Sequence, residues 1–225
     1  MAQDKLQKHV LSTYLTLRYG TGIIALCFPI FVYLYGLICG VSLQNSISAY
    51  YWADGFESAP VRIWFVGVLF ALASFFYLYK GFTPKENIAF NLAGLFAIGL
   101  AYFPMPWGCG TECPKFTVHG FCAVSLFVCL VYIVWFRSSD TLSELNDPVL
   151  EKKYKNKYRI ISIFMGASPL TAFILNTFVG KPGAFVFFAE SCGIWAFACY
   201  WWIKNGELKK SLAVHKALRI PVPHP

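Results

Sequence analysis

The sequence predicts an all-α fold: a polytopic membrane protein, built as a six-helix transmembrane bundle with a short N-terminal amphipathic helix. Of its 225 residues, 57% are hydrophobic and only 13% are charged. Soluble domains are usually about 45–50% apolar and about 25% charged, so this chain has too few charges to cover a soluble surface. The composition excludes an ordinary soluble enzyme, a disordered chain and a nucleic-acid-binding module, and no nucleic-acid partner is expected. We expect one transmembrane domain over residues 1–225.

The N-terminal residues precede the first apolar stretch and have a pattern of their own. Leu6, Val10, Tyr14 and Leu17 recur at helical spacing and form one apolar stripe. This pattern is typical of an amphipathic helix that lies on the cytoplasmic face of a membrane. A cytoplasmic extension of the first spanning helix fits the same residues equally well.

Six apolar stretches follow, each long enough to cross a hydrocarbon core of about 30 Å, which takes about 20 helical residues. They are Gly20–Gly40, Val61–Gly81, Asn87–Met105, Lys115–Phe136, Tyr158–Gly180 and Ala184–Ile203. Pro29 in the first stretch and Pro169 in the fifth predict kinks. The longest loop, from Arg137 to Lys157, is expected to form a short cytoplasmic helix. Its Thr141 and Glu144 have the spacing of a capping box.

The basic residues predict the orientation of the chain. Sixteen of the 19 Lys and Arg residues lie in the termini and in alternate loops, and three lie on the other side, namely Arg62, Lys115 and Lys181. Because cytoplasmic loops are enriched in Lys and Arg, both termini are expected in the cytoplasm. The predicted location is an integral one in the plasma membrane, or in the inner membrane if the protein is bacterial.

Polar residues in the predicted spans gather near the outer side. At 1.5 Å per residue, Glu190 lies about 9 Å and His119 about 6 Å below the outer ends of their helices. Asn176 lies at a similar depth, and Ser46 and Ser48 lie in the loop above them. Ionisable residues inside a membrane are costly and are often functional. We therefore expect His119, Glu190, Ser46, Ser48 and Asn176 to form a ligand-binding site between the first, fourth, fifth and sixth helices.

Several chemistries remain open for these residues. The side chains could hold helices together by hydrogen bonds. His119 and Glu190 could bind zinc if Asp54 or Glu57 supplied a third ligand, although no paired-histidine motif is present and haem is not expected. A serine of the loop, with His119 and Glu190, would resemble a Ser–His–acid arrangement.

Two cysteines in an outer loop have a separate interpretation. Cys109 and Cys113 flank three residues in the loop between the third and fourth helices. In an oxidising compartment such a pair favours a small disulfide loop. This bond would fix the start of the fourth helix and with it the position of His119.

The run Ser46–Tyr51 resembles a segment of uncharacterised six-span bacterial membrane proteins. The resemblance rests on that run and on Pro60, Phe65–Gly67, Tyr79–Gly81, Phe103–Pro104, His119 and Glu190, and it extends from about residue 20 to 205. More distantly, the Ile–Ser pair and the following proline are similar to the Frag/DRAM/Sfk membrane proteins, whose roles touch lipid remodelling and lipid-linked trafficking. The seven-span CREST hydrolases bind zinc through three histidines and an aspartate, a set that this sequence lacks.

These observations lead to a functional expectation with two alternatives. The favoured function is lipid binding or lipid modification in the outer leaflet, by a membrane-embedded hydrolase or transferase if it is an enzyme, with membrane lipids as partners. A proton-coupled transporter or channel is the first alternative. Against it, the cytoplasmic half offers few polar residues beyond Asn87 and Asn91. The second alternative is a structural or partner-binding membrane subunit.

Overall fold

The computed structural model describes residues 2–53, 61–109, 114, 116–178 and 183–218, with the side chains of all but 2–4, 176–178 and 214–218. Every regular element in this part of the chain is a helix, which confirms the all-helical prediction. The elements are α1 (Ala2–Ile38), η1 (Ser48–Tyr51), α2 (Val61–Leu78), α3 (Pro84–Tyr102), α4 (Val118–Tyr132), η4 (Ile133–Arg137), η5 (Ser138–Leu145), α5 (Pro148–Phe178) and α6 (Phe185–Leu218).

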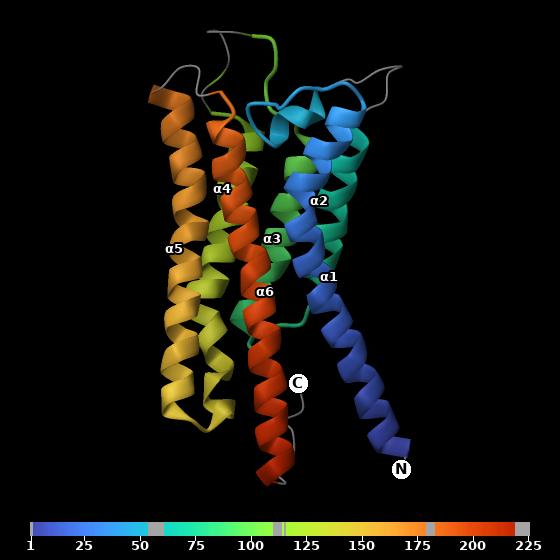
Figure 1. Ribbon diagram of the computed structural model, residues 1–225, viewed down its shortest axis with the longest axis vertical. Coiled ribbons are helices and arrows are strands. Elements are labelled where there is room, and N and C mark those ends of the chain that lie inside the picture. The colour runs from blue at the N-terminus through green and yellow to red at the C-terminus, as the bar shows by residue number, and fades with distance from the viewer. Residues whose placement is uncertain (1, 54–60, 110–113, 115, 179–182, 219–225) are drawn as a thin grey trace.

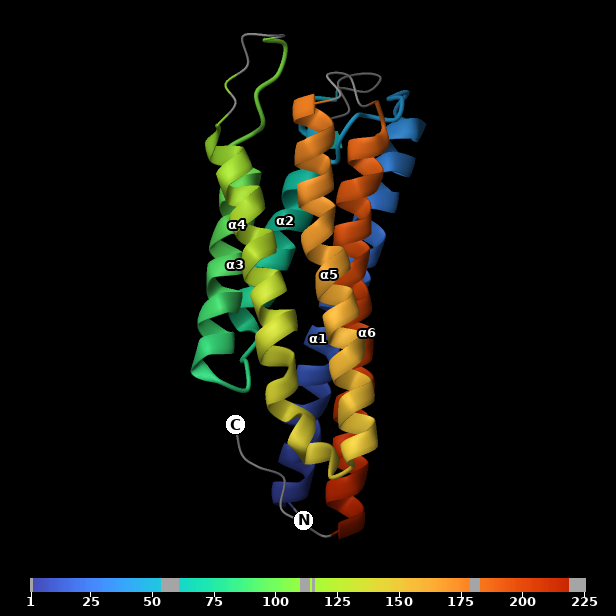
Figure 2. The ribbon, with the colours of Figure 1, turned by 90° about the vertical axis from the view of Figure 1, so that its left-hand side faces the viewer.

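The long helices form an up-and-down bundle, in which successive helices run in opposite directions. Each packs on the next one along the chain, and α6 packs back on α1 (Figure 1). The view turned by 90° about the vertical axis shows α3 beside α4 and α5 beside α6 (Figure 2). We call the end that carries residues 39–53 the loop end. The opposite end, where α1 begins and α6 ends, is the termini end.

Five of the described helical segments are long and apolar enough to cross a membrane. They are Lys5–Ile38, Val61–Leu78, Val118–Leu145, Pro148–Leu175 and Phe185–Ala213. Helix α3 has 19 residues but is not among them, because its first two turns carry Lys85, Glu86, Asn87 and Asn91. The structure therefore supports a membrane protein with five apolar helices, and leaves the count of six spans as a prediction.

The outer surface of the bundle is apolar along its length. Ile63, Phe121, Phe164 and Leu170 all have exposed side chains, as do many other large hydrophobic residues. Soluble monomers rarely expose apolar patches larger than a few hundred Å², so this surface fits a lipid environment. The interior is aromatic, with the Trp201 ring of α6 packed against the Phe90 and Tyr79 rings.

Two sequence-based expectations need correction. The N-terminal segment is not a separate amphipathic helix, because α1 runs without a break from Ala2 to Ile38. No proline separates its polar first turns from its apolar part, and the helix continues through Gly20 and Gly22. The loop helix expected between residues 137 and 157 is also different, since η4 and η5 continue from α4 and α5 already begins at Pro148.

Local side chains set where the helices begin. Thr83 and Thr117 cap α3 and α4, each accepting a backbone N–H three residues on. Asp147 accepts the N–H groups of Val149 and Leu150 and so caps α5. Such caps contribute about 1 kcal/mol each. Thr141 is not a helix cap, because its hydroxyl donates to a carboxylate of α6 instead.

Candidate functional site

The segment 39–53 folds back over the loop end of the bundle. The backbone oxygen of Asn45 accepts a hydrogen bond from the backbone N–H of Phe187 at 2.9 Å, which joins the segment to the start of α6. The Trp52 indole donates to the backbone oxygen of Met105 at 2.8 Å, which joins it to the chain after α3. The Tyr50 side chain is fully buried beside the Phe187 ring. The segment is thus held against helices from both halves of the chain.

Ser48 and His119 form the central contact of this end. The Ser48 hydroxyl oxygen lies 3.0 Å from Nε2 of His119, although the two residues are 71 positions apart in sequence. Nδ1 of the same ring lies 2.9 Å from the backbone oxygen of Phe103. A carbonyl oxygen can only accept, so in the neutral ring Nδ1 carries the proton. Nε2 is then left to accept the hydroxyl proton of Ser48.

The surrounding chain fixes this orientation. Thr117 caps α4 and holds its first turn, in which His119 is buried. Phe103 directly follows α3. The two helices approach closely there, since a Cβ atom at Gly99 would lie only 2.6 Å from the Cys122 sulfur. The glycine therefore lets the Phe103 carbonyl come within hydrogen-bonding distance of the ring.

Glu190 binds the residue next to Ser48. Its Oε2 accepts the backbone N–H of Ile47 at 2.7 Å. The side chain is half-buried, and no described residue donates to its second oxygen. The structure therefore brings the two predicted ionisable residues, one on α4 and one on α6, to consecutive positions of the loop segment.

The other predicted site residues have different outcomes. Ser46 is buried and accepts the N–H of Ala49 at 3.1 Å, so its hydroxyl holds the turn that precedes η1. The side chain of Asn176 lies outside the described residues. Cys109 takes part in a disulfide bond. Cys113 lies outside the described residues, so the predicted pairing of the two stays a prediction.

The described side chains do not assemble a metal site at this end. No three His, Cys, Asp or Glu residues gather within the described part of the chain. Both ring nitrogens of His119 are engaged by Ser48 and Phe103. Asp54 and Glu57, the third ligands considered from sequence, lie outside the described residues.

A buried polar network at the termini end was missed by the sequence reasoning. The Lys204 ammonium group lies 3.1 and 3.2 Å from the two Glu207 carboxylate oxygens and 2.7 Å from the Ser138 backbone oxygen. Thr141 and Tyr158 also donate to that carboxylate. Lys204 and Glu207 are 4% and 2% exposed.

The sequence pattern singled out Asn87 and Asn91 as the few polar residues toward this end and did not include Lys204 or Glu207. These two residues follow the last predicted apolar stretch, where charged residues ordinarily face water. The spacing of Lys204 and Glu207 could have indicated this pair. Opposite charges three residues apart on a helix lie on the same face, and both residues fall within about one turn of the end of the apolar stretch.

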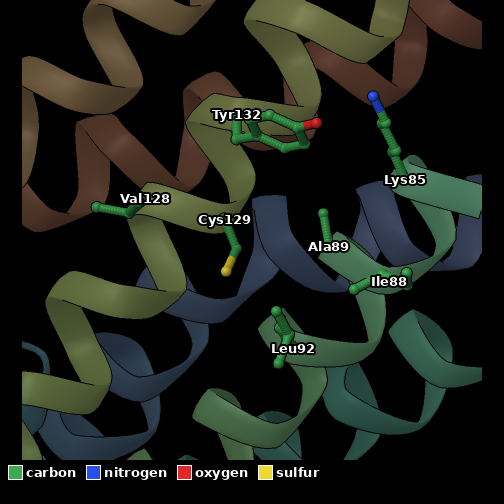
Figure 3. Close-up of a pocket in the computed structure, with 7 residues that line it drawn as sticks. All are labelled: Lys85, Ile88, Ala89, Leu92, Val128, Cys129 and Tyr132. Carbon is green, nitrogen blue, oxygen red and sulfur yellow. The ribbon is translucent and has the colours of Figure 1, made fainter.

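Two hollows on the surface lie outside the loop-end site. One, of about 360 Å³, runs between α3 and α4. Figure 3 shows Lys85 and Tyr132 at one end of it and the side chains of Ile88, Leu92 and Val128 along it. The second lies over η5 and the start of α5, near Ser139 and Lys152. Neither hollow includes His119 or Glu190.

Comparison of the chain with family models, with curated proteins and with solved structures finds no match.

Proposed function

We propose that this chain is an integral membrane protein with six spans and both termini in the cytoplasm, and that its loop end modifies acyl lipids in the outer leaflet. The distribution of Lys and Arg supports this orientation, since sixteen of the 19 lie in the two terminal segments and in the loops that follow the second and fourth helices. The apolar outer surface supports the membrane location. In this orientation Ser48 and His119 lie near the outer boundary of the hydrocarbon core, where the ester groups of membrane lipids also lie.

The observation that carries the proposal is the hydrogen bond between the Ser48 hydroxyl and His119 Nε2, with Nδ1 held by the Phe103 carbonyl. A serine is a weak nucleophile until a base takes its proton. In the Ser–His–Asp triad the third group orients the ring and fixes which nitrogen is protonated. Here the Phe103 carbonyl fills that orienting role. It supplies no negative charge, so the pair should be a slower base than a full triad.

The chemistry that follows is acyl transfer. The Ser48 oxygen attacks the carbonyl carbon of a lipid ester while Nε2 of His119 takes the hydroxyl proton. The bond to the lipid alcohol breaks, and the departing alcohol takes that proton from His119. The acyl chain stays on Ser48 until water or a second lipid alcohol attacks it by the same proton route. The products are a free fatty acid in the first case and an acylated lipid in the second.

The geometry around Ser48 offers support for the oxyanion and for positioning. Ser48 is the first residue of η1, and its backbone N–H has no acceptor among the described residues. It is free to donate to an oxygen that becomes negative during attack. Glu190 anchors the adjacent Ile47 N–H and so helps to fix the position of the serine. Glu190 is a positioning residue in this scheme.

The test is acyl turnover by the full chain in vesicles of phosphatidylethanolamine and phosphatidylglycerol, with fatty acid and acylated products measured by lipid mass spectrometry. Ser48→Ala and His119→Gln should each lower the rate by about a thousandfold or more. Ser46→Ala is the matched control, because the Ser46 hydroxyl bonds to Ala49 and Met105 and makes no hydrogen bond to His119. It should keep most of the activity.

Two outcomes would reject the proposal. Turnover that persists in Ser48→Ala would place the chemistry elsewhere. No turnover in the wild type, together with a large stability loss in both variants, would favour the structural role, in which the hydrogen bonds only hold the loop end together.

A second candidate, proton-coupled transport, is favoured by one observation, the buried Lys204–Glu207 network. It supplies ionisable groups in the cytoplasmic half of the proposed bundle, and such groups often mark proton paths. Proton-driven flux in proteoliposomes that is lost in both Glu190→Gln and Glu207→Gln would favour transport. Flux that is absent from the wild type would reject it.

A further inference from the structure

Arg18 is a buried cation, and two of its three guanidinium nitrogens have no hydrogen-bond acceptor among the described residues. It lies on α1, is 2% exposed, and has its guanidinium 5.4 Å from the Tyr14 ring and 5.6 Å from the Trp201 ring. Its Nε and Nη2 atoms are shielded from solvent and donate to no described residue. No described carboxylate lies within ion-pair distance of it. Buried polar groups in proteins nearly always have a partner, so these donors call for one.

The register of α1 against α6 brings further unpartnered donors to the same level. The two helices are antiparallel and side by side (Figure 1). The Arg18 guanidinium lies over the Trp201 ring of α6. The ring of the next residue, Tyr19, contacts Lys209. Trp201, Asn205 and Lys209 are each four residues apart and share one face of α6, so Asn205 lies between these two contacts.

Three α6 side chains near Arg18 are buried and unpartnered. The Tyr200 hydroxyl, the Trp201 indole N–H and both polar atoms of the Asn205 amide have no hydrogen-bond partner among the described residues. With Arg18 they form the Arg18 cluster, which offers donors from two helices. Its acceptors are the Asn205 amide oxygen and the Tyr200 hydroxyl oxygen. The cluster is therefore rich in donors and lacks acceptors.

The nearby carboxylates are already engaged. Glu207 accepts from Lys204, Thr141 and Tyr158. Glu86, which is also buried, accepts the backbone N–H of Phe82 at 2.7 Å and faces the Tyr79 hydroxyl. Neither is within ion-pair distance of Arg18. An external group with several acceptor oxygens would satisfy the Arg18 cluster.

We propose that the Arg18 cluster binds a phosphate group at the termini end of the bundle. A guanidinium pairs with phosphate through parallel N–H bonds, and the amide, indole and phenol groups supply further donors. The termini end is rich in Lys and Arg, and this charge attracts anions to it. The phosphate group would come from a lipid headgroup or from the free ion. The site lies at the opposite end from Ser48, so it stands or falls separately from the lipid-modifying site.

The test is thermal unfolding of the full chain in a neutral maltoside detergent. Sodium phosphate is compared with sodium chloride at equal ionic strength, and phosphatidic acid with diacylglycerol of the same acyl chains. Each pair differs in the phosphate group. A ligand that binds the folded state raises the unfolding temperature, so we expect phosphate or phosphatidic acid to raise it and its partner to leave it unchanged. A rise with phosphatidic acid alone identifies a lipid headgroup, and a rise with both identifies phosphate itself.

Variants locate the site. Arg18→Gln and Asn205→Leu should each weaken phosphate binding by about tenfold or more, since each removes hydrogen bonds to a charged group. Lys209→Gln is the matched control, because Lys209 is exposed and lies near the same level of α6. It should leave the affinity within about twofold, as expected for an exposed charge.

Three results would overturn the proposal. The first is no response to either phosphate compound in the wild type, which would leave water as the occupant of the cluster. The second is an equal loss in Lys209→Gln, which would reduce the effect to general charge attraction. The third is full binding by Asn205→Leu, which decides the matter even if Arg18→Gln does not fold.

Discussion

Replacing Glu207 with Gln tests whether the buried network at the termini end holds the helices together. The carboxylate accepts two contacts from Lys204 at 3.1 and 3.2 Å and two hydroxyl hydrogen bonds. The Gln side chain keeps one acceptor oxygen and puts an amino group where a second acceptor is needed. Lys204, only 4% exposed, would lose its counter-ion.

The expected loss is large because the pair is buried. Removing one partner of a buried ion pair usually costs about 3–5 kcal/mol of unfolding free energy. Asp140→Asn is the matched control. The Asp140 carboxylate lies 3.3 Å from the Arg137 guanidinium, but the Arg137 and Asp140 side chains are 24% and 21% exposed. That change should cost about 1 kcal/mol or less.

Equilibrium unfolding in mixed detergent micelles would measure the losses in Glu207→Gln and Asp140→Asn. The single variant Lys204→Met and the double variant Lys204→Met/Glu207→Gln would measure the coupling between Lys204 and Glu207. Residues in one network usually show a coupling energy of about 0.5–3 kcal/mol, so the double variant should lose less than the sum of the single losses. If Glu207→Gln is no worse than Asp140→Asn, or if the single losses simply add, the charge on Glu207 does not stabilise the bundle.

Three further predictions use the same unfolding assay. Gly99→Ala should lower the unfolding free energy by about 1–3 kcal/mol, because its new Cβ would lie 2.6 Å from the Cys122 sulfur. Gly67→Ala, with open space around its Cβ, should be neutral or stabilising. Equal effects of the two substitutions would refute the close approach of α3 and α4. Asp147→Ala should cost about 1 kcal/mol by removing the cap of α5, and an unchanged stability would mean that the cap is not formed. Trp195→Phe should cost about 1 kcal/mol by removing its hydrogen bond to α1, and a gain in stability would argue against that bond.

Apolar stretches predicted the helices well because their length and composition follow from the thickness of a membrane. The structure has a helix at each predicted stretch, including α3, whose polar first turns leave its spanning role open. The pattern could not show that α1 is continuous, since an amphipathic stripe is the same for a separate helix and for an extension. Pro29 lies inside that helix without ending it.

The candidate site was predicted in part. Depth below the membrane surface singled out His119 and Glu190, and the loop above them supplied Ser48. The hydrogen bond between Ser48 and His119 could not be predicted, because it joins residues 71 positions apart through tertiary packing. Lys204 and Glu207 were missed for a different reason. Hydropathy assigns charged residues after a span to water, but here they face η5 and α5 within the bundle.

The central claim is that Ser48 is a nucleophile activated by His119. Its most direct test is labelling of the membrane-reconstituted protein with a fluorophosphonate probe, which reacts with activated serines, followed by mass spectrometry of the peptide that contains Ser46 and Ser48. We predict one adduct on Ser48 in the wild type, the same adduct in Ser46→Ala, and none in Ser48→Ala or His119→Gln. An unlabelled wild type, or an adduct that survives in His119→Gln, would contradict the account.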